Sequence, residues 1–289
     1  MSIPAAYLGV ILIWTTTPLA IKWSAEGAGF FFGLTARMAI GAVVGLALLA
    51  ALRIPLPQHR AARLTYLCSG GGIFASMLCT YWGSQFLPSG WVSVLFGLNP
   101  LLTTAMAAFW LKEERPTPLK LGGMLLGLFG LLVVFGSGLK LGTQAGWGLG
   151  AIVLATGIHS LSAIWVKRFD ARIPALAVTA GGVSVCLVLL LATWGLLGLH
   201  WPAQISPRAA WSILYLGVVG SVFGFALYFY VLRYLEATRV ALITLVTPVS
   251  ALLLGHLLNQ EPLGPRIWLG TAAILLGLLC CQMRRRPRN

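Results

Sequence analysis

The sequence predicts an all-α integral membrane protein with ten transmembrane helices, arranged as two inverted five-helix repeats. Three observations predict this class. The 289 residues are 58% hydrophobic and 9% charged, with a mean hydropathy of +0.90, whereas a soluble domain carries about 25% charged residues. Apolar stretches of about 20 residues, long enough to cross a bilayer, recur along the chain. Two sequence blocks also recur at a single offset.

Breaks rich in charge, proline or glycine divide the chain into the ten predicted spans. The spans cover residues 3–22, 29–52, 64–87, 90–111, 119–136, 147–166, 175–199, 209–232, 238–258 and 266–283. The connections are too short for a soluble domain. The first apolar run has no basic residues before it and no small-residue cleavage site after it, so we expect it to stay as the first span.

Lys and Arg are distributed unevenly between the two sides of the predicted topology. With the N-terminus placed inside, the inner loops and the tail hold fifteen, the outer side holds four, and Arg37 alone lies within a span, which accounts for all 20. The positive-inside rule then favours both termini in the cytoplasm. The net charge of +14 therefore marks topology, and we expect a lipid bilayer rather than nucleic acid as the partner.

Two blocks of the sequence match each other. "NPLLTTAMAAFWLKEERP" aligns with "TPVSALLLGHLLNQEP", which puts Pro100 over Pro248 and Glu113 over Glu261, each 148 residues apart. The helices that follow align through "LGG" and "LGT". Chance similarity among helices rich in Leu, Ala and Gly is the alternative explanation.

The matched blocks predict two units of five spans, residues 1–137 and 146–284. An odd number of spans in each unit inverts the second copy in the membrane. Inverted repeats are typical of secondary transporters, in which the substrate site lies near the midplane between the repeats.

Several motifs carry a family resemblance. The opening helix reads "ILIWTTTPLAIKW" (11–23), the second helix "FFFGLTARMAIGA" (30–42) holds the single internal Arg37, and each Pro-to-Glu block precedes a Gly-spaced helix (Gly123 to Gly130, Gly270 to Gly277). Together these features resemble the EamA branch of the drug/metabolite transporter superfamily. One departure is the "WTTTP" of the first helix, where the family often reads W-G-S, which implies a different polar lining.

The resemblance covers nearly the whole chain and implies a ten-helix carrier in the plasma membrane, the inner membrane of a bacterium. Many members export amino acids and other metabolites, and this chain looks most like the YddG-type exporters of aromatic amino acids. The resemblance thus implies a small-molecule substrate, with no cofactor, no metal and no enzymatic activity. A facilitative channel, or an exporter of other metabolites or drugs, is the alternative.

Pro100 and Pro248 each lie about ten residues into a predicted span. A proline inside a helix frees a carbonyl and bends the helix, and in lipid that carbonyl needs protein or cavity water as a partner. We predict a hinge or gating role for both prolines. Close packing of the small residues around them is an equally good explanation.

Arg37 lies about eight residues into its span, about 12 Å deep at 1.5 Å per residue. Intramembrane ionisable residues are rare and commonly functional, and no acid lies at a similar depth. The guanidinium has three possible partners: main-chain carbonyls, the carboxylate of a substrate, or water reached by snorkelling. We favour a structural or gating role.

His159 lies near the centre of the sixth span, where a histidine binds substrate, relays a proton or bonds a neighbouring hydroxyl as a neutral ring. Several aromatic residues also lie within spans rather than at the interfaces. A central pocket with aromatic walls and few polar groups suits an aromatic or amphipathic solute. We predict that the substrate-binding residues are Trp14, Thr15, Tyr81, Gln85, Asn99, Thr103, His159, Ser162, Tyr228 and Thr244.

Other function classes fit less well. An intramembrane enzyme needs a nucleophile–base pair or a metal cluster, and we find no His/Glu zinc spacing and no deep carboxylate. Glu113 and Glu261 lie at span ends, where a carboxylate is hydrated or caps a helix. Proton coupling through His159 and facilitated diffusion both stay open, and the pattern predicts no oligomeric state.

Overall fold

The computed structural model describes residues 2–87, 92, 95–113, 116–135, 144–169, 171–198, 200–248, 250 and 265–282. Within these ranges every regular element is a helix and there is no strand. The helices are α1 (Ile3–Ala25), α2 (Phe30–Ala51), α3 (Arg60–Gly83), α5 (Asn99–Trp110), α6 (Pro118–Phe135), α7 (Ala145–Phe169), α8 (Ala175–Leu196), α9 (Pro207–Tyr215), the π-helix η1 (Leu216–Phe223), α10 (Gly224–Tyr234), α11 (Ala237–Ala241) and α13 (Pro265–Gln282). The all-α prediction is therefore confirmed for the described chain.

Five helical segments are long and apolar enough to cross a membrane. They are α1, α2, α7, α8 and the continuous segment Pro207–Tyr234. Shorter apolar helices cover Pro118–Val133, Ala237–Pro248 and Trp268–Cys281. Several spanning helices with short connections make this a multi-pass membrane protein.

The segment Pro207–Tyr234 contains a feature that the sequence pattern did not indicate. Its middle, η1, is a π-helix, a wider turn that is rare and often lies at functional sites. It packs on α2, where a Cβ added at Gly217 would lie 2.7 Å from Cβ of Ile40. Only glycine allows this approach, which brings Ser221 of η1 against the middle of α2.

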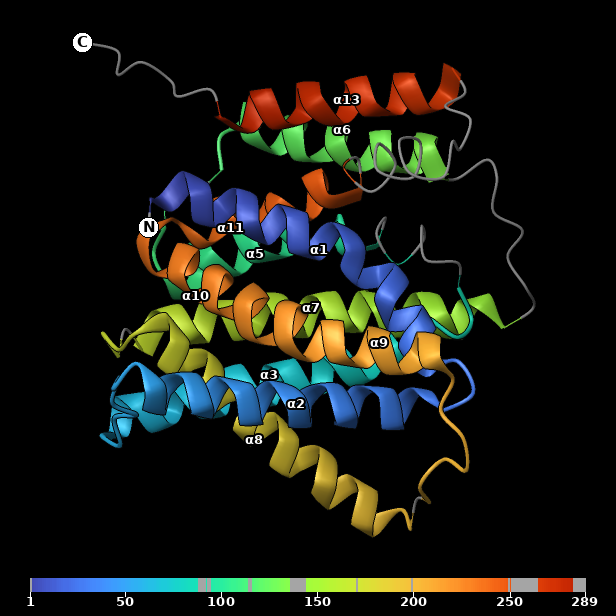
Figure 1. Cartoon of the computed structure of the whole chain (residues 1–289). Helices are drawn as coiled ribbons and strands as arrows, with labels where there is room; N and C mark the ends of the chain where they lie inside the picture. The colour runs from blue at the N-terminus through green and yellow to red at the C-terminus, as the bar shows by residue number, and fades with distance from the viewer. Residues whose placement is uncertain are drawn as a thin grey trace.

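Helices α6 and α13 lie side by side along one edge of the molecule (Figure 1). Their glycines meet backbone to backbone: a Cβ at Gly123 would lie 2.5 Å from O of Gly277, and one at Gly130 would lie 2.6 Å from O of Gly270. Small residues permit such close contact between membrane helices. The Gly-spaced helices that follow the two matched blocks are therefore packing partners.

The prolines differ in their surroundings. Pro100 lies in the first turn of α5, where its missing N–H breaks no helical hydrogen bond, so the chain starts a helix there rather than bending one. Pro248 is buried and helical, and residues 251–264, which include Glu261, lie outside the described residues. Pro18 lies inside α1 and was not anticipated.

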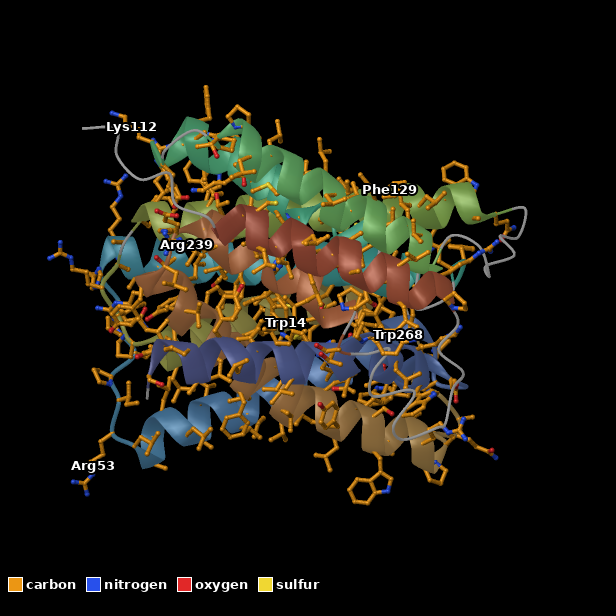
Figure 2. The ribbon with its side chains drawn as sticks, turned by 90° about the horizontal axis from the view of Figure 1, so that it is seen from above. Trp14, Arg53, Lys112, Phe129, Arg239 and Trp268 are labelled. Atoms are coloured by element: carbon orange, nitrogen blue, oxygen red, sulfur yellow. The ribbon has the colours of Figure 1, made fainter. Side chains whose placement is uncertain are left out.

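Basic residues gather at one end of the bundle. Arg53, Lys112 and Arg239 all lie at the end where α1 begins (Figure 2, left). We call this the basic end. Helix α1 runs from it toward the opposite end, as α3 does, and α2 and α7 run back.

Candidate functional site

A cavity of about 100 Å³ lies among α1, α2, α3, α7 and α10. One water molecule needs about 10–15 Å³ of such space, so the cavity has room for a small solute. The described residues of its lining are Trp14, Thr17, Pro18, Ile21, Lys22, Arg37, Met77, Thr80, Ser84, Leu87, Val92, Phe96, His159, Phe225, Thr244 and Thr247. The lining runs from the middle of α1 toward the end where Lys22 lies, away from the basic end.

One face of α1 contributes Trp14, Pro18 and Ile21, with Thr17 and Lys22 beside them. These positions recur at spacings of three and four residues and therefore share one side of the helix. Because Pro18 has no N–H, the carbonyl of Trp14 loses its usual helical donor. The face of α1 toward the cavity thus combines an indole, a hydroxyl and a main-chain acceptor.

Aromatic rings surround His159. Its ring centroid lies 5.9 Å from Trp14, 5.4 Å from Tyr228 and 6.4 Å from Phe96, and Trp14 and Tyr228 lie 5.1 Å apart. His159 Nε2 is buried and has no hydrogen-bond partner among the described residues. We call Trp14, Phe96, His159 and Tyr228 the aromatic box. Its rings suit an apolar or aromatic group, and Nε2 is free to bond a solute.

Arg37 is buried within the membrane part of α2, with 1% of its surface exposed. Its Nε donates to Ser221 Oγ at 2.9 Å, and its Nη1 lies 4.0 Å from Met77 Sδ. No ion pair of the described residues includes it. Burial excludes snorkelling, and a serine, rather than a main-chain carbonyl, holds its Nε.

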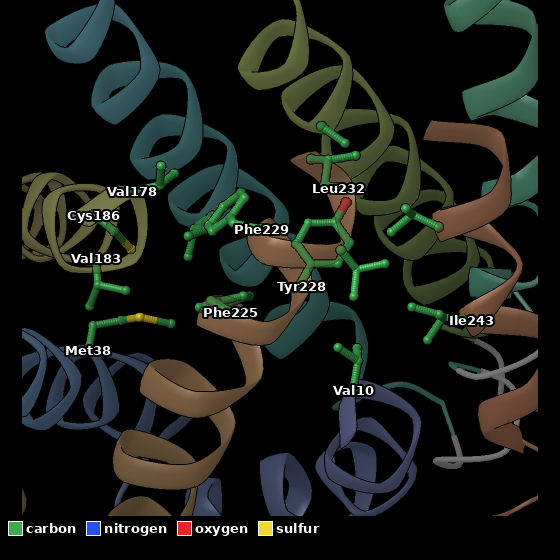
Figure 3. Packing of buried hydrophobic residues seen from close by; sticks show 14 of the residues in the cluster. Val10, Met38, Val178, Val183, Cys186, Phe225, Tyr228, Phe229, Leu232 and Ile243 are labelled. Atoms are coloured by element: carbon green, nitrogen blue, oxygen red, sulfur yellow. The ribbon is translucent and has the colours of Figure 1, made fainter. Parts of the chain in front are cut away.

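Apolar packing fills the space on the other side of the aromatic box. Figure 3 shows Tyr228 with Val10, Leu232 and Ile243 around it, all from one buried cluster. Along α10 these contacts lead from Phe225, which lines the cavity, toward the basic end. The cavity is therefore closed on this side by close-packed side chains.

Polar contacts join the helices at the basic end, beside a smaller hollow of about 60 Å³ that Lys167 and Leu232 line. Lys167 Nζ donates to Glu113 Oε1 at 2.9 Å and to the carbonyl of Leu235 at 2.6 Å. The same carboxylate oxygen accepts from the N–H of Ala237 at 3.0 Å and so caps α11. We call Glu113, Lys167, Leu235 and Ala237 the Glu113 cluster. It joins α7, the end of α5 and the α10–α11 connection, which are distant in sequence.

The predicted site residues divide into two groups. Trp14, His159, Thr244 and Arg37 line the cavity, and Tyr228 contacts Trp14 and His159. The cavity lining does not include the other six, which are Thr15, Tyr81, Gln85, Asn99, Thr103 and Ser162. Gln85 is exposed and donates to the carbonyl of Trp82, and Tyr81 is fully buried against Ser24.

The remaining polar side chains of that group bond within or between helices. Asn99 Oδ1 accepts from Ser160 at 2.6 Å and from Thr103 at 3.1 Å, which ties α5 to α7. Ser162 donates to the carbonyl of Cys68, and Thr15 to that of Ile11. Buried hydroxyls and amides need such partners in an apolar surrounding, and at these positions that need is met by the protein.

Much of the cavity lining was not predicted from the sequence, including Lys22, Met77, Thr80, Ser84 and Phe225. A helical stripe drawn through Trp14 would have identified Thr17, Pro18 and Lys22 on α1. On α3 the predicted Tyr81 is itself outside the lining, but Met77 lies four residues before it and Ser84 three residues after it, so a stripe drawn through Tyr81 would have identified both.

Comparisons with known proteins agree with this architecture. The model of the EamA-like transporter family matches residues 2–136 and 146–281. The chain is 29% identical to the uncharacterized transporter YoaV of Bacillus subtilis over 94% of this chain and 93% of that one. It is 27% identical to a probable terminal-alkyne amino-acid exporter of Streptantibioticus cattleyicolor over 96% and 93%.

Two further similarities are more distant. The chain is 25% identical to an S-adenosylmethionine/S-adenosylhomocysteine transporter of Chlamydia muridarum, over 92% of this chain and 86% of that one. A solved crystal structure superposes with a TM-score of 0.77 at 22% identity and covers 98% of both chains. At that identity the likeness shows the fold alone.

Proposed function

Because this chain belongs to the EamA-like transporter family, we propose that it is a secondary transporter that exports small organic metabolites by alternating access. Amino acids, aromatic and hydrophobic ones included, are the proposed substrates. The observation that carries the proposal is a cavity with aromatic walls that close-packed side chains and an ion pair separate from the basic end. A pathway that is hollow on one side of a central site and closed on the other is what alternating access requires.

The aromatic box and the nearby cations suit an amino acid. The rings of Trp14, Phe96 and Tyr228 offer apolar surface for its side chain, and Arg37 and Lys22 offer positive charge for its carboxylate. The similarity to a probable terminal-alkyne amino-acid exporter supports the same class. We propose Trp14, Arg37, His159, Tyr228 and Thr244 as the residues at this site.

We propose that ten spans form two inverted halves, residues 1–137 and 146–284. The packing of the described helices supports this. Helix α3 packs on α7 and α8, and the segment formed by η1 and α10 packs on α1 and α2. If the two halves are exchanged, the contacts of α3 with α7 and α8 correspond to those of the η1–α10 segment with α1 and α2. The contact between α6 and α13 then corresponds to itself. The hinge role of Pro100 and Pro248 remains a proposal.

We propose that both termini are cytoplasmic, so that the basic end faces the cytoplasm. The gathering of Arg53, Lys112 and Arg239 supports this orientation. The cavity then reaches toward the outside, and the Glu113 cluster closes the cytoplasmic side. Export requires this cluster to open when the outer side closes.

Transport measurements on the purified protein in liposomes test the proposal. Vesicles loaded with unlabelled phenylalanine should take up labelled phenylalanine by counterflow, and the initial rate should saturate with concentration. Uptake with and without a pH gradient distinguishes proton coupling from facilitated diffusion. A rate that rises linearly with concentration, without counterflow, would indicate a channel, and absent flux of every amino acid tested would overturn the substrate class.

A matched pair of tryptophan variants locates the site. Trp14 lines the cavity, whereas Trp211 is 71% exposed on α9. We expect Trp14→Ala to lower counterflow about five- to thirtyfold, since stacking and burial of a solute on one ring are worth about 1–2 kcal/mol. Trp211→Ala should leave counterflow unchanged, and equal losses in both variants would contradict the assignment.

A further inference from the structure

We propose that Arg37 binds the carboxylate of the transported solute, with Lys22 as a second cation nearer the mouth of the cavity, and that the solute's ammonium group is not required. This inference deepens the proposed function and rests on it. The site would select aromatic and hydrophobic carboxylates over amines of the same shape. Three features of the cavity carry it: the missing anion, the geometry of the guanidinium, and the charge of the lining.

The first feature is a buried cation without an anion. Arg37 lies seven residues from the start of α2, about 10 Å along the helix, and it is 1% exposed. Burying a charge is costly unless the charge is paired. Among the described residues its contacts are neutral, to Ser221 and Met77. An anion that enters the cavity would supply the missing charge.

The second feature is the orientation of the guanidinium. Ser221 of η1 holds the Nε edge at 2.9 Å, and neither terminal nitrogen has an oxygen acceptor among the described residues. Gly220 keeps the space beside Nη2 free, since a Cβ there would lie 3.4 Å from that nitrogen. The planar fork of an arginine suits a carboxylate, which accepts two parallel hydrogen bonds from it.

The third feature is the charge of the lining. Lys22 and Arg37 both line the cavity, and the lining residues that the structure describes include no Asp or Glu. Lys22 has no ion pair among the described residues. Two cations attract anions, and the described part of the lining offers no carboxylate that could bind an ammonium group. The rings of the aromatic box then accommodate the apolar body of the solute.

Binding of three related probes tests this without any substitution. The full-length protein in detergent is titrated calorimetrically with phenylalanine, phenylpropionate and phenylethylamine, which share the ring and differ in charge. We expect dissociation constants within about tenfold for the two carboxylates. Phenylethylamine should bind at least about tenfold more weakly. Equal binding of phenylethylamine, or binding of none of the three, would overturn the proposal.

Substitutions then identify which cation binds the carboxylate. Arg37→Gln should weaken binding of both carboxylates at least tenfold, and Lys22→Gln should weaken it about threefold because that cation lies nearer the mouth. Arg53→Gln, an exposed cation of the basic end, is the matched control and should bind like the wild type. Unchanged affinity in Arg37→Gln would overturn the proposal. If Arg37→Gln does not fold, Arg37→Lys, which keeps the charge but loses the fork, is measured in its place, with the same expected direction.

Liposome transport separates this inference from the proposed function. Carboxylate binding that depends on Arg37, without any flux in liposomes, would support the anion site and refute the transporter. Saturable amino-acid flux that is equal in wild type and Arg37→Gln would support the transporter and refute the anion site.

Discussion

Two cations of this protein, Lys167 at the end of α7 and the buried Arg37 within α2, have different surroundings. Lys167 donates to Glu113 and to a main-chain carbonyl, and these contacts join helices at the basic end. Arg37 faces a serine, a methionine sulfur and a cavity. The difference indicates that the two cations have different roles. Where the protein supplies its own anion, a cation joins helices, and where it does not, the cation is available to a solute.

The packing of apolar side chains also differs between the two ends. Toward the basic end Val10, Leu232 and Ile243 pack around Tyr228 (Figure 3). Toward the other end, past Trp14 and His159, the side chains leave a cavity. Close-packed side chains and paired charges must separate before that side can open. A cavity with an unpaired cation can bind an anionic solute without such a change.

The largest effect is expected from breaking the Glu113–Lys167 pair. The side chains are only 14% (Glu113) and 24% (Lys167) exposed, so Lys167→Met leaves a poorly hydrated carboxylate without its counter-charge. We expect the free energy of unfolding to fall by at least about 2 kcal/mol, measured by thermal denaturation in detergent. Adding Glu113→Gln should recover part of the loss.

The pair Glu236–Arg239 is the control for that measurement. It is also an ion pair of the basic end, but its side chains are about half exposed, at 49% and 48%. Glu236→Gln should cost less than about 0.5 kcal/mol, because water replaces the lost partner. Similar losses at both pairs would show that the Glu113 cluster has no special role.

The second effect tests the two cations directly against each other. Arg37→Met leaves no carboxylate of the described chain without a partner, so its melting temperature should stay close to that of the wild type. Counterflow of phenylalanine should fall at least about tenfold, or 1.4 kcal/mol. A large loss of stability with undiminished counterflow would reverse the roles assigned to Arg37 and Lys167.

A smaller effect separates neighbouring positions on α1. Thr15 and Thr17 each donate to a main-chain carbonyl within α1, but only Thr17 lines the cavity. Thr17→Val should change the KM for phenylalanine two- to tenfold, as expected for one hydrogen bond of about 0.5–1.5 kcal/mol. Thr15→Val removes the same local bond and should leave KM unchanged. Equal shifts would mean that the loss comes from α1 itself rather than from the cavity.

The smallest effect concerns a single contact of the basic end. Tyr7 Oη donates to the carbonyl of Arg239 at 3.0 Å. Tyr7→Phe should cost about 0.5 kcal/mol and lower the melting temperature by about 1–2 °C, with less than a twofold change in counterflow. A larger loss of counterflow would make Tyr7 part of the closure rather than a local support.

The fold was more accessible from the sequence than the site was. Apolar length alone located α1, α2, α7 and α8, and the internal positions of Trp14 and His159 marked them as site residues. Thr15 was predicted where Thr17 lines the cavity, because successive residues of a helix face directions about 100° apart and the rotation of α1 is decided by its neighbours. Asn99 was predicted for the same site, but its amide oxygen accepts hydrogen bonds from Ser160 and Thr103.

By itself the sequence determined the membrane class, the helical content, the approximate limits of the five long apolar segments and the matched Pro-to-Glu blocks. These follow from composition and from the thickness of a bilayer, which act along a single segment. Only the tertiary structure decided that Lys167 meets Glu113, 54 residues away, and that Arg37 meets Ser221, 184 residues away, with no acid among its described contacts. Such pairings depend on which helix faces pack together, and no local pattern in the chain contains that information.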